Sequence, residues 1–230
     1  EVARVVDTYV TGSLLREHRQ EIIDGVVLSL RTPLGGLIGP TTLAEVSSAD
    51  RLNELNFEMG LAAFSHGVMV NNIGKVLVQS LERAGRFEDV LMPYARVLAS
   101  DAFAVPLYGL MNGSIDTLIR FSQDAQPRLF ITDWKSNRLD EDGMAYVIDG
   151  YSRESMVNAM EHHHYPLQAL IYGTAVHRYL RSRAGSGTSL PVIAGMAYFF
   201  IRGMVGEPTP MEEEHRHGVF TWEAPKGLWQ

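Results

Sequence analysis

Two short runs of alternating apolar residues constrain the fold of this chain more than any other feature. The first run spans Gly113 to Phe121, and the second spans Leu129 to Lys135. A polar turn, Gln123 to Pro127, separates the two runs. Strand-like runs joined by so short a link favour an antiparallel hairpin.

Charged residues lie on both runs of this hairpin. Asp133 and Lys135 are two positions apart, so they project from one face of their strand, roughly 7 Å apart. Asp116 lies on the preceding strand and converges on Asp133 if the register is favourable. Two carboxylates attract Mg²⁺, and a nearby ammonium group stabilises charge on a reacting phosphate. The pattern favours a phosphodiester-cleaving site, although its spacing alone equally allows a surface hairpin with a solvated ion pair.

The rest of the chain predicts helices packed on a mixed sheet. Helical spacing covers 2–30, and a proline at a first helical position opens a helix over 166–183. The remaining predictions are a loop over 33–42, a short turn or helix over 42–49, a strand over 55–59, an irregular connection over 60–75, a helix over 87–100, a loop over 137–152, and strands over 192–201 and 219–222. This pattern indicates an α/β architecture.

Composition narrows the class of protein. The 230 residues contain no cysteine, which excludes disulfides and thiolate metal sites. The net charge of −7 counts against a free-standing nucleic-acid binder, so we expect partner subunits to supply a basic track. No signal peptide or long apolar run is present, and we expect a cytoplasmic protein. The first residue is Glu1, and the chain is expected to be part of a longer one, with a lead-in segment over 1–54 and one compact unit over 55–230.

Four motifs resemble one family in order and spacing. They are Asn112-Gly-Ser-Ile-Asp-Thr-Leu-Ile-Arg120, Ile131-Thr-Asp-Trp-Lys-Ser-Asn137, Tyr165-Pro-Leu-Gln-Ala-Leu-Ile-Tyr172 and Val176-His-Arg-Tyr-Leu180. Together they resemble the C-terminal nuclease domain of RecB, the beta subunit of exodeoxyribonuclease V. The likeness continues through Tyr198 to Gly203 and covers most of residues 55–222.

The resemblance implies a fold, an activity and a set of site residues. The family has the PD-(D/E)xK nuclease fold, a mixed central sheet flanked by helices, and uses Mg²⁺, with Mn²⁺ as a substitute. By position, Asp116 and Asp133 would be metal ligands and Lys135 the catalytic lysine. Gln168 and Tyr172 match the family's Gln-x-x-x-Tyr helix motif, and Tyr165 would contact DNA or cap the helix. The implied partners are DNA, as duplex ends and single strands, and RecC-like and RecD-like subunits.

One family motif has no counterpart in the first 54 residues. The relatives place a metal-ligand histidine in a Gly-x-x-x-His helix before the first strand, and the context of His18 does not match it. His66 follows the first strand and is interpreted as a loop histidine. Without this ligand, metal affinity and cleavage by the fragment are in doubt.

Other candidates have simpler interpretations. Glu58 is a candidate third carboxylate, but a surface position fits better, and Ile131 is expected in the core. His162 to His164 are read as a polar loop rather than a transition-metal tract, Glu212 to Glu214 as a solvated turn, and Gln168 with Tyr172 also fits a plain amphipathic helix. Two rival functions stay open: a catalytically inert module that binds DNA or a partner subunit, and an unrelated metal enzyme acting on a small phosphoester.

Overall fold

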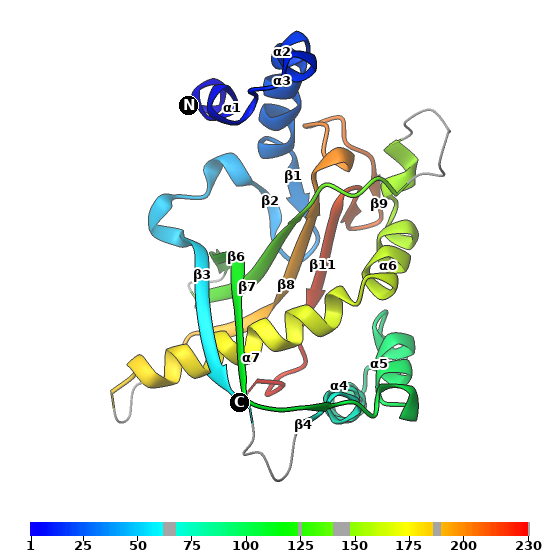
Figure 1. Ribbon diagram of the computed structural model, residues 1–230. Coiled ribbons are helices and arrows are strands. Elements are labelled where there is room, and N and C mark those ends of the chain that lie inside the picture. Colours follow the sequence, from blue (N-terminus) through cyan, green and yellow to red (C-terminus); the bar gives the residue numbers. More distant parts are fainter. Residues whose placement is uncertain (62–67, 124–125, 140–147, 186–189, 230) are drawn as a thin grey trace. The chain divides into compact units, whose positions relative to one another are not determined.

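The structure is a computed structural model that describes residues 1–61, 68–123, 126–139, 148–185 and 190–229 (Figure 1). The strands are β1 Pro33–Gly35, β2 Gly39–Thr42, β3 Arg51–Gly60, β4 Val68–Met69, β5 Pro106–Leu107, β6 Leu110–Gln123, β7 Gln126–Lys135, β8 Val192–Phe200, β9 Met211–Glu212, β10 His215–Arg216 and β11 Val219–Glu223. The α-helices are α1 Val2–Tyr9, α2 Ser13–Glu17, α3 Arg19–Leu30, α4 Val70–Arg83, α5 Met92–Leu98, α6 Arg153–His162 and α7 Tyr165–Arg183, and five short 3₁₀ turns, η1 Leu43–Glu45, η2 Ser48–Asp50, η3 Asp101–Phe103, η4 Ile148–Tyr151 and η5 Ile201–Gly203, complete the described elements.

The main sheet has five strands in the order β11-β8-β7-β6-β3. The hairpin of β6 and β7 is antiparallel, and β3 pairs antiparallel with β6 on the other side. Helices α6 and α7 lie between β7 and β8 in the chain, and β8 runs in the same direction as β7 (Figure 1). A long helical crossover is what a parallel pair requires. The predicted mixed sheet flanked by helices is therefore confirmed.

The chain divides into two compact units made of interleaved segments. The first comprises Glu1–Ser48, Trp134–Met156 and Ala197–Thr221, and the second comprises Ala49–Asp133, Val157–Met196 and Trp222–Gln230. Bulky side chains fill the interior of the first unit; among the fully buried ones are Tyr151, Phe199, Phe200 and Phe220. The boundary predicted between residues 54 and 55 remains a prediction.

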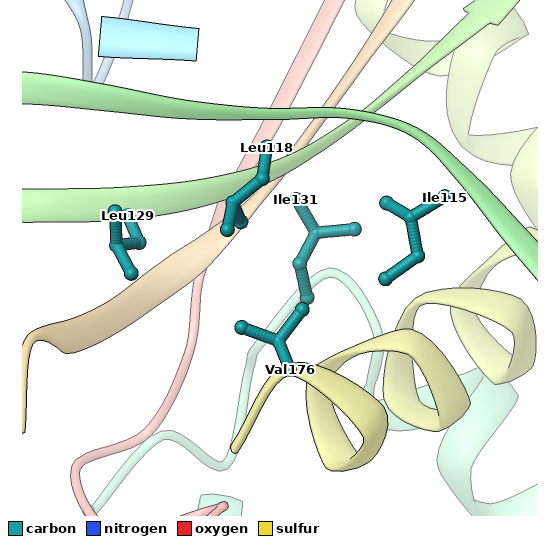
Figure 2. Close-up of a cluster of buried hydrophobic side chains, with 5 residues drawn as sticks. All are labelled: Ile115, Leu118, Leu129, Ile131 and Val176. Atoms are coloured by element: carbon teal, nitrogen blue, oxygen red, sulfur yellow. The ribbon is translucent and has the colours of Figure 1, made fainter. Parts of the chain in front are cut away.

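The core of the second unit joins the hairpin to α7. Ile115, Leu118, Leu129 and Ile131 from β6 and β7 pack against Val176 of α7. Figure 2 shows these side chains directed toward one another between the strands and the helix. Ile131 is fully buried, as predicted. Burial of apolar surface on both elements fixes the hairpin against the helix.

Helix α7 agrees closely with its sequence prediction. Pro166 lies in its first turn, where a missing N–H costs nothing. Its buried residues recur at helical spacing: Pro166, Ala169, Leu170, Gly173, Ala175 and Val176. The strands predicted over 55–59, 192–201 and 219–222 and the helical spacing over 2–30 are also confirmed, the last as three helices.

Two predicted connections are wrong in the described residues, because proline and glycine in 33–42 and glycine and asparagine in 60–75 were read as loop signals; residues 62–67 lie outside the described ones. Residues 33–42 contain β1 and β2, which pair antiparallel with an irregular register. In the predicted connection over 60–75, helix α4 begins at Val70 and buries Asn71 and Gly74. A Cβ on Gly74 would lie 2.4 Å from the backbone nitrogen of Ala99, so this glycine allows α4 to approach the end of α5 closely.

The remaining differences concern short helices. The helix expected over 87–100 is confined to Met92–Leu98, and α6 was not predicted because Arg153–His162 has little apolar periodicity. Of the loop predicted over 137–152, residues 140–147 lie outside the described ones, and Ile148–Tyr151 forms a 3₁₀ turn. Among the helices that the structure describes, none is long and apolar enough to span a membrane.

Candidate functional site

The two predicted carboxylates come from neighbouring strands of the hairpin. Thr117 pairs with Thr132 at the end of the β6–β7 ladder, and Asp116 and Asp133 are the next residues beyond this pair on the two strands. The hydroxyl of Thr132 donates a hydrogen bond of 2.8 Å to the carbonyl oxygen of Thr117, which ties the strands together at this point.

The side chains of strand β6 do not alternate regularly between the two faces of the sheet around Asp116. Ile115 and Leu118 are three positions apart, yet both point into the same core beside Val176 (Figure 2). A regular strand would direct them to opposite faces. On β3, the residue at the matching position is Glu54, whose φ of 52° is left-handed. Asp116 is therefore at a bend, and its side chain is half-buried.

Asp133 is the more enclosed of the two acids. Its exposed fraction is only 3%, whereas most carboxylates in folded proteins are solvated. A buried carboxylate needs compensating partners, such as hydrogen-bond donors or a cation. Its neighbours on β7, Ile131 and Thr132, are fully buried, so the strand passes from core to ionic residues within two positions.

Tyr172 on α7 lies close to both carboxylates. Burial raises the pKa of the Tyr172 phenol, the hydrogen bond from Gln168 lowers it, and the negative charges of Asp133 and Asp116 raise it further. The amide nitrogen of Gln168 donates to the Tyr172 hydroxyl at 3.0 Å. The charges of both acids thus act on Tyr172, which is bonded to Gln168, and all four residues belong to the second unit.

An aromatic contact fixes the other side of Tyr172. The ring of Phe57 on β3 meets it edge to face, with ring centroids 5.8 Å apart. The same Phe57 ring covers Gly113 of β6, where a Cβ would lie 2.7 Å from its Cζ atom. Sequence reasoning missed Phe57, although a glycine beside an alternating strand signals that another group lies over the backbone.

Lys135 and Trp134 lie at the end of β7. The Lys135 ammonium lies over the Tyr198 ring, 5.3 Å from its centroid, and its side chain is half-buried. Trp134 packs on Phe199, with ring centroids 5.1 Å apart. Lys135 follows Asp133 by two residues on β7. The prediction that the two side chains share a face of the strand rests on this spacing.

Tyr165 begins helix α7 in a histidine-rich turn. Its ring stacks on His163, with centroids 5.2 Å apart and an interplanar angle of 25°. His162 is the last residue of α6, so the polar loop predicted for His162 to His164 is wrong for His162 and is confirmed for the exposed His163 and His164, which connect the two helices. The turn also meets Tyr94 of α5, a contact that no sequence pattern indicated.

The other candidates lie at the surface or outside the description. Glu58 and Glu212 to Glu214 are exposed, as predicted. His18 is exposed and lies 2.5 Å from Glu21. His66 falls outside the described residues. Within the described ranges, no group of three or more histidine, aspartate or glutamate side chains gathers as a metal site, so the acids on β6 and β7 are a pair.

Comparison with known proteins gives a consistent result. No family model matches the chain. The RecB subunit of the RecBCD enzyme from Mycolicibacterium smegmatis is 33% identical over 233 aligned residues, which cover 99% of this chain and 21% of that protein. The RecB subunit from Mycobacterium tuberculosis is 37% identical over 203 residues, covering 86% of this chain and 18% of that protein. In Escherichia coli RecB the match is 34% over 121 residues, or 52% of this chain.

The chain thus spans about a fifth of the length of the two mycobacterial relatives. Along nearly its whole length it aligns with proteins of one name, at identities of 33% and 37% for the mycobacterial relatives. The chain belongs to the RecB family of RecBCD enzyme subunits.

Proposed function

We propose that this chain is a metal-dependent deoxyribonuclease, the nuclease part of a RecB-like helicase-nuclease that acts in double-strand break repair and recombination. The observation behind the proposal is that Asp116 and Asp133 follow directly on the last paired residues of β6 and β7, and that both charges act on Tyr172. Membership of the RecB family supports the same activity.

The donor set suits a hard divalent cation. Mg²⁺ and Mn²⁺ prefer oxygen ligands, and Mg²⁺ often uses only one or two carboxylates plus substrate phosphate. The low exposure of Asp133 fits this, because a cation offsets the cost of burying its charge. Asp116 and Asp133 would hold the ion, which when bound polarises a phosphoryl oxygen and acidifies water.

The other residues of the site would position the substrate and its charge. Lys135, two residues after Asp133 in the sequence of β7, would orient the attacking water or stabilise charge developing on phosphorus. Gln168 and Tyr172 are bonded to each other in the first half of α7, and Phe57 supports the tyrosine ring. This arrangement holds polar groups of the helix beside the carboxylates before DNA arrives.

The name of the relatives supports a setting for this activity. Because they are named RecBCD enzyme subunit RecB, we propose RecC-like and RecD-like subunits and DNA ends as partners, and the cytoplasm as the location. The chain contains no Gly-x-x-x-x-Gly-Lys-Ser/Thr phosphate loop, so any helicase step is assigned outside these 230 residues.

The test is digestion of long linear duplex DNA in Mg²⁺ by the chain and by matched variants. Lys135→Ala and Asp133→Asn should each reduce cleavage at least a hundredfold, whereas Glu58→Gln, an exposed acid on β3, should leave it unchanged. A small chromogenic phosphodiester tests for the unrelated phosphoesterase. Equal DNA digestion by the parent chain and Lys135→Ala would refute the mechanism.

One observation favours a second candidate, an inert module that binds DNA or a partner subunit. The described residues bring two acids together rather than three ligands, and residues 1–54 contain no Gly-x-x-x-His motif. Calorimetric titration with Mn²⁺ separates the two candidates. A nuclease should bind the ion in a manner that Asp133→Asn abolishes, and an inert module should give the same trace for both proteins.

A further inference from the structure

Strand β3 has a free edge. It is the last strand of the five-stranded sheet, and within the described residues it pairs only with β6. Every second residue of such a strand turns its backbone N–H and C=O groups away from the sheet. Among the described residues, a single hydrogen bond reaches residues 55–60 from outside the β3–β6 pair: Nη1 of Arg178 donates to the carbonyl oxygen of Gly60 at 2.9 Å. The other outward groups of this segment can pair with another chain.

The opposite edge of the same sheet is closed. Strand β11 is buried at four of its five residues. Nη1 of Arg153 donates to the carbonyl oxygen of Thr221 at 3.1 Å, and Nη1 of Arg86 donates to that of Glu223 at 2.7 Å. Proteins cover the edges of a sheet in such ways because an uncovered edge pairs with other chains. In the part of the chain that the structure describes, residues 55–60 of β3 have no comparable cover.

A groove of about 420 Å³ follows this free edge within the second unit. Along 55–60 of β3, more buried and exposed residues alternate. Residues of both kinds line the groove, so its wall is the edge of the strand rather than one of its faces. The other wall comes from α7; its lining residues are Ala175, Arg178, Tyr179 and Ser182.

Helix α7 continues past β3 at this edge (Figure 1). Ala175 is buried, whereas Tyr179, one turn further along, is 39% exposed although its ring is large and apolar. Neighbouring strands of a sheet lie about 4.8 Å apart. One strand added beside β3 would therefore lie over the exposed part of α7 and cover the Tyr179 ring.

The α7 wall of the groove is basic. The sequence of α7 contains no acidic residue, and Arg183 lies over the Tyr179 ring, 5.2 Å from its centroid. The bond to Gly60 uses one of the five N–H groups of the Arg178 guanidinium and leaves its positive charge in place. The acid of the lining, Glu58, is exposed and alternates with the residues of β3 that face α7. An acidic side chain on the α7 side of an added strand would meet positive charge.

We propose that the free edge of β3 docks an extended, acidic segment of a partner protein as an added strand. Backbone hydrogen bonds to 55–60 hold the segment, its apolar residues cover Tyr179, and a carboxylate approaches Arg178. Exposed sheet edges recognise peptides in this way, with alternate side chains providing specificity. Strand β3 of a second copy fits less well, because the left-handed Glu54 interrupts its ladder. Neither Asp116 nor Asp133 lines the groove, so the proposal does not depend on nuclease activity.

The test follows a fluorescent peptide, Glu-Thr-Val-Thr-Val-Thr-Glu, by anisotropy. Its order is the same in both directions, so either strand direction places the valines over α7 and a glutamate near Arg178. The same peptide with lysine for glutamate should bind at least about threefold more weakly. This difference should shrink in Arg178→Gln and persist in Arg96→Gln, which removes an exposed arginine of α5. An equal difference in both variants would contradict the role of Arg178.

A modified peptide tests the backbone bonds without any change in the protein. Methylation of its backbone nitrogens removes the hydrogen-bond donors and retains the side chains and the charge. Affinity should fall at least about tenfold, because several backbone hydrogen bonds are lost. Equal affinity of the methylated peptide, or no binding of the parent peptide, would overturn the proposal.

Amide hydrogen exchange locates the bound peptide. Added protection should appear at alternate residues of 55–60, because only the outward N–H groups gain a partner. Protection confined to other segments would place the peptide elsewhere and overturn the proposal. Sedimentation distinguishes a partner protein from a second copy: the chain should remain a monomer, whereas a dimer that the peptide dissociates would make a second copy the occupant and refute the proposed partner.

Discussion

The hydroxyl of Tyr94 lies 3.2 Å from Nδ1 of His164, which is 70 positions further along the chain. The same hydroxyl accepts a hydrogen bond from the backbone N–H of Leu167. His164 is the N-cap residue of α7, has a left-handed φ of 54° and makes no side-chain cap of its own. Tyr94 of α5 therefore caps α7 from a distant element, and the capped turn is the one that begins the Gln168 pair.

Removal of this hydroxyl should weaken the second unit. Tyr94 is buried, with 3% exposed, so Tyr94→Phe leaves the N–H of Leu167 without its acceptor. We expect a loss of about 1–2 kcal/mol in the free energy of unfolding, the usual cost of a lost helix cap. Urea denaturation measures it, with Tyr108→Phe, at a half-exposed tyrosine, as the control. Equal losses in both variants would contradict the capping role.

Alkaline pH should act on the same residue. Burial raises the pKa of Tyr94 to about 12, the Leu167 N–H opposes this shift, and the Glu161 charge adds to it. An unfolded tyrosine ionises near pH 10, so between about pH 10 and 12 the unfolded chain releases a proton that the folded chain retains. The stabilisation is complete below pH 10 and is lost as the pH rises to 12, by up to about 3 kcal/mol.

Urea midpoints measured across this pH range check the expectation. Tyr94→Phe should remove part of the decline above pH 10, and Tyr108→Phe should leave the decline as it is in the parent chain. A decline of the same steepness in Tyr94→Phe would place the titrating group elsewhere.

A methyl group at Gly113 should disturb the support of Tyr172. The added Cβ would lie 2.7 and 2.9 Å from two atoms of the Phe57 ring, so the ring must move. We expect Gly113→Ala to lose about 1–3 kcal/mol of stability, as overpacked sites do. Gly60→Ala on β3 is the matched control, because nothing lies within 4 Å of its Cβ position. Thermal unfolding of both variants decides the question, and equal melting temperatures would show that the ring yields without cost.

Local patterns in the sequence predicted the centre of the fold and the place of the acids. The alternation of apolar residues over 113–135 predicted the β6–β7 hairpin. Because residues two apart on a strand face the same way, it also predicted that Asp133 shares a face of β7 with Ile131 and Lys135. The register of the β6–β7 pair beside Asp116 and Asp133 could not be predicted, because it depends on how the strands are linked between Gln123 and Gln126, and the left-handed φ of Glu54 on β3 has no sequence signal. Helix α4 was missed because Gly74 signals a loop by itself and is explained only by its contact with α5.

The contacts that support the site also join residues that lie far apart in the sequence. Phe57 and Tyr94 are ordinary core residues in their own segments, and they acquire a role only through Tyr172 and His164 on other elements. Contacts between distant segments are what a single sequence does not specify.

The convergence of the acids on Tyr172 can be tested without any metal or DNA. The charges of Asp133 and Asp116 each raise the pKa of the Tyr172 phenol. Asp133→Asn removes one of them and should lower this pKa, and the double variant with Asp116→Asn should lower it further. ¹³C NMR of labelled tyrosines, with Tyr172→Phe to assign the signal, measures the shift. Glu58→Gln, an exposed acid on β3, should leave the titration unchanged. If Asp133→Asn has no more effect than Glu58→Gln, the carboxylates do not meet at Tyr172, and a metal ion shared between them loses its structural basis.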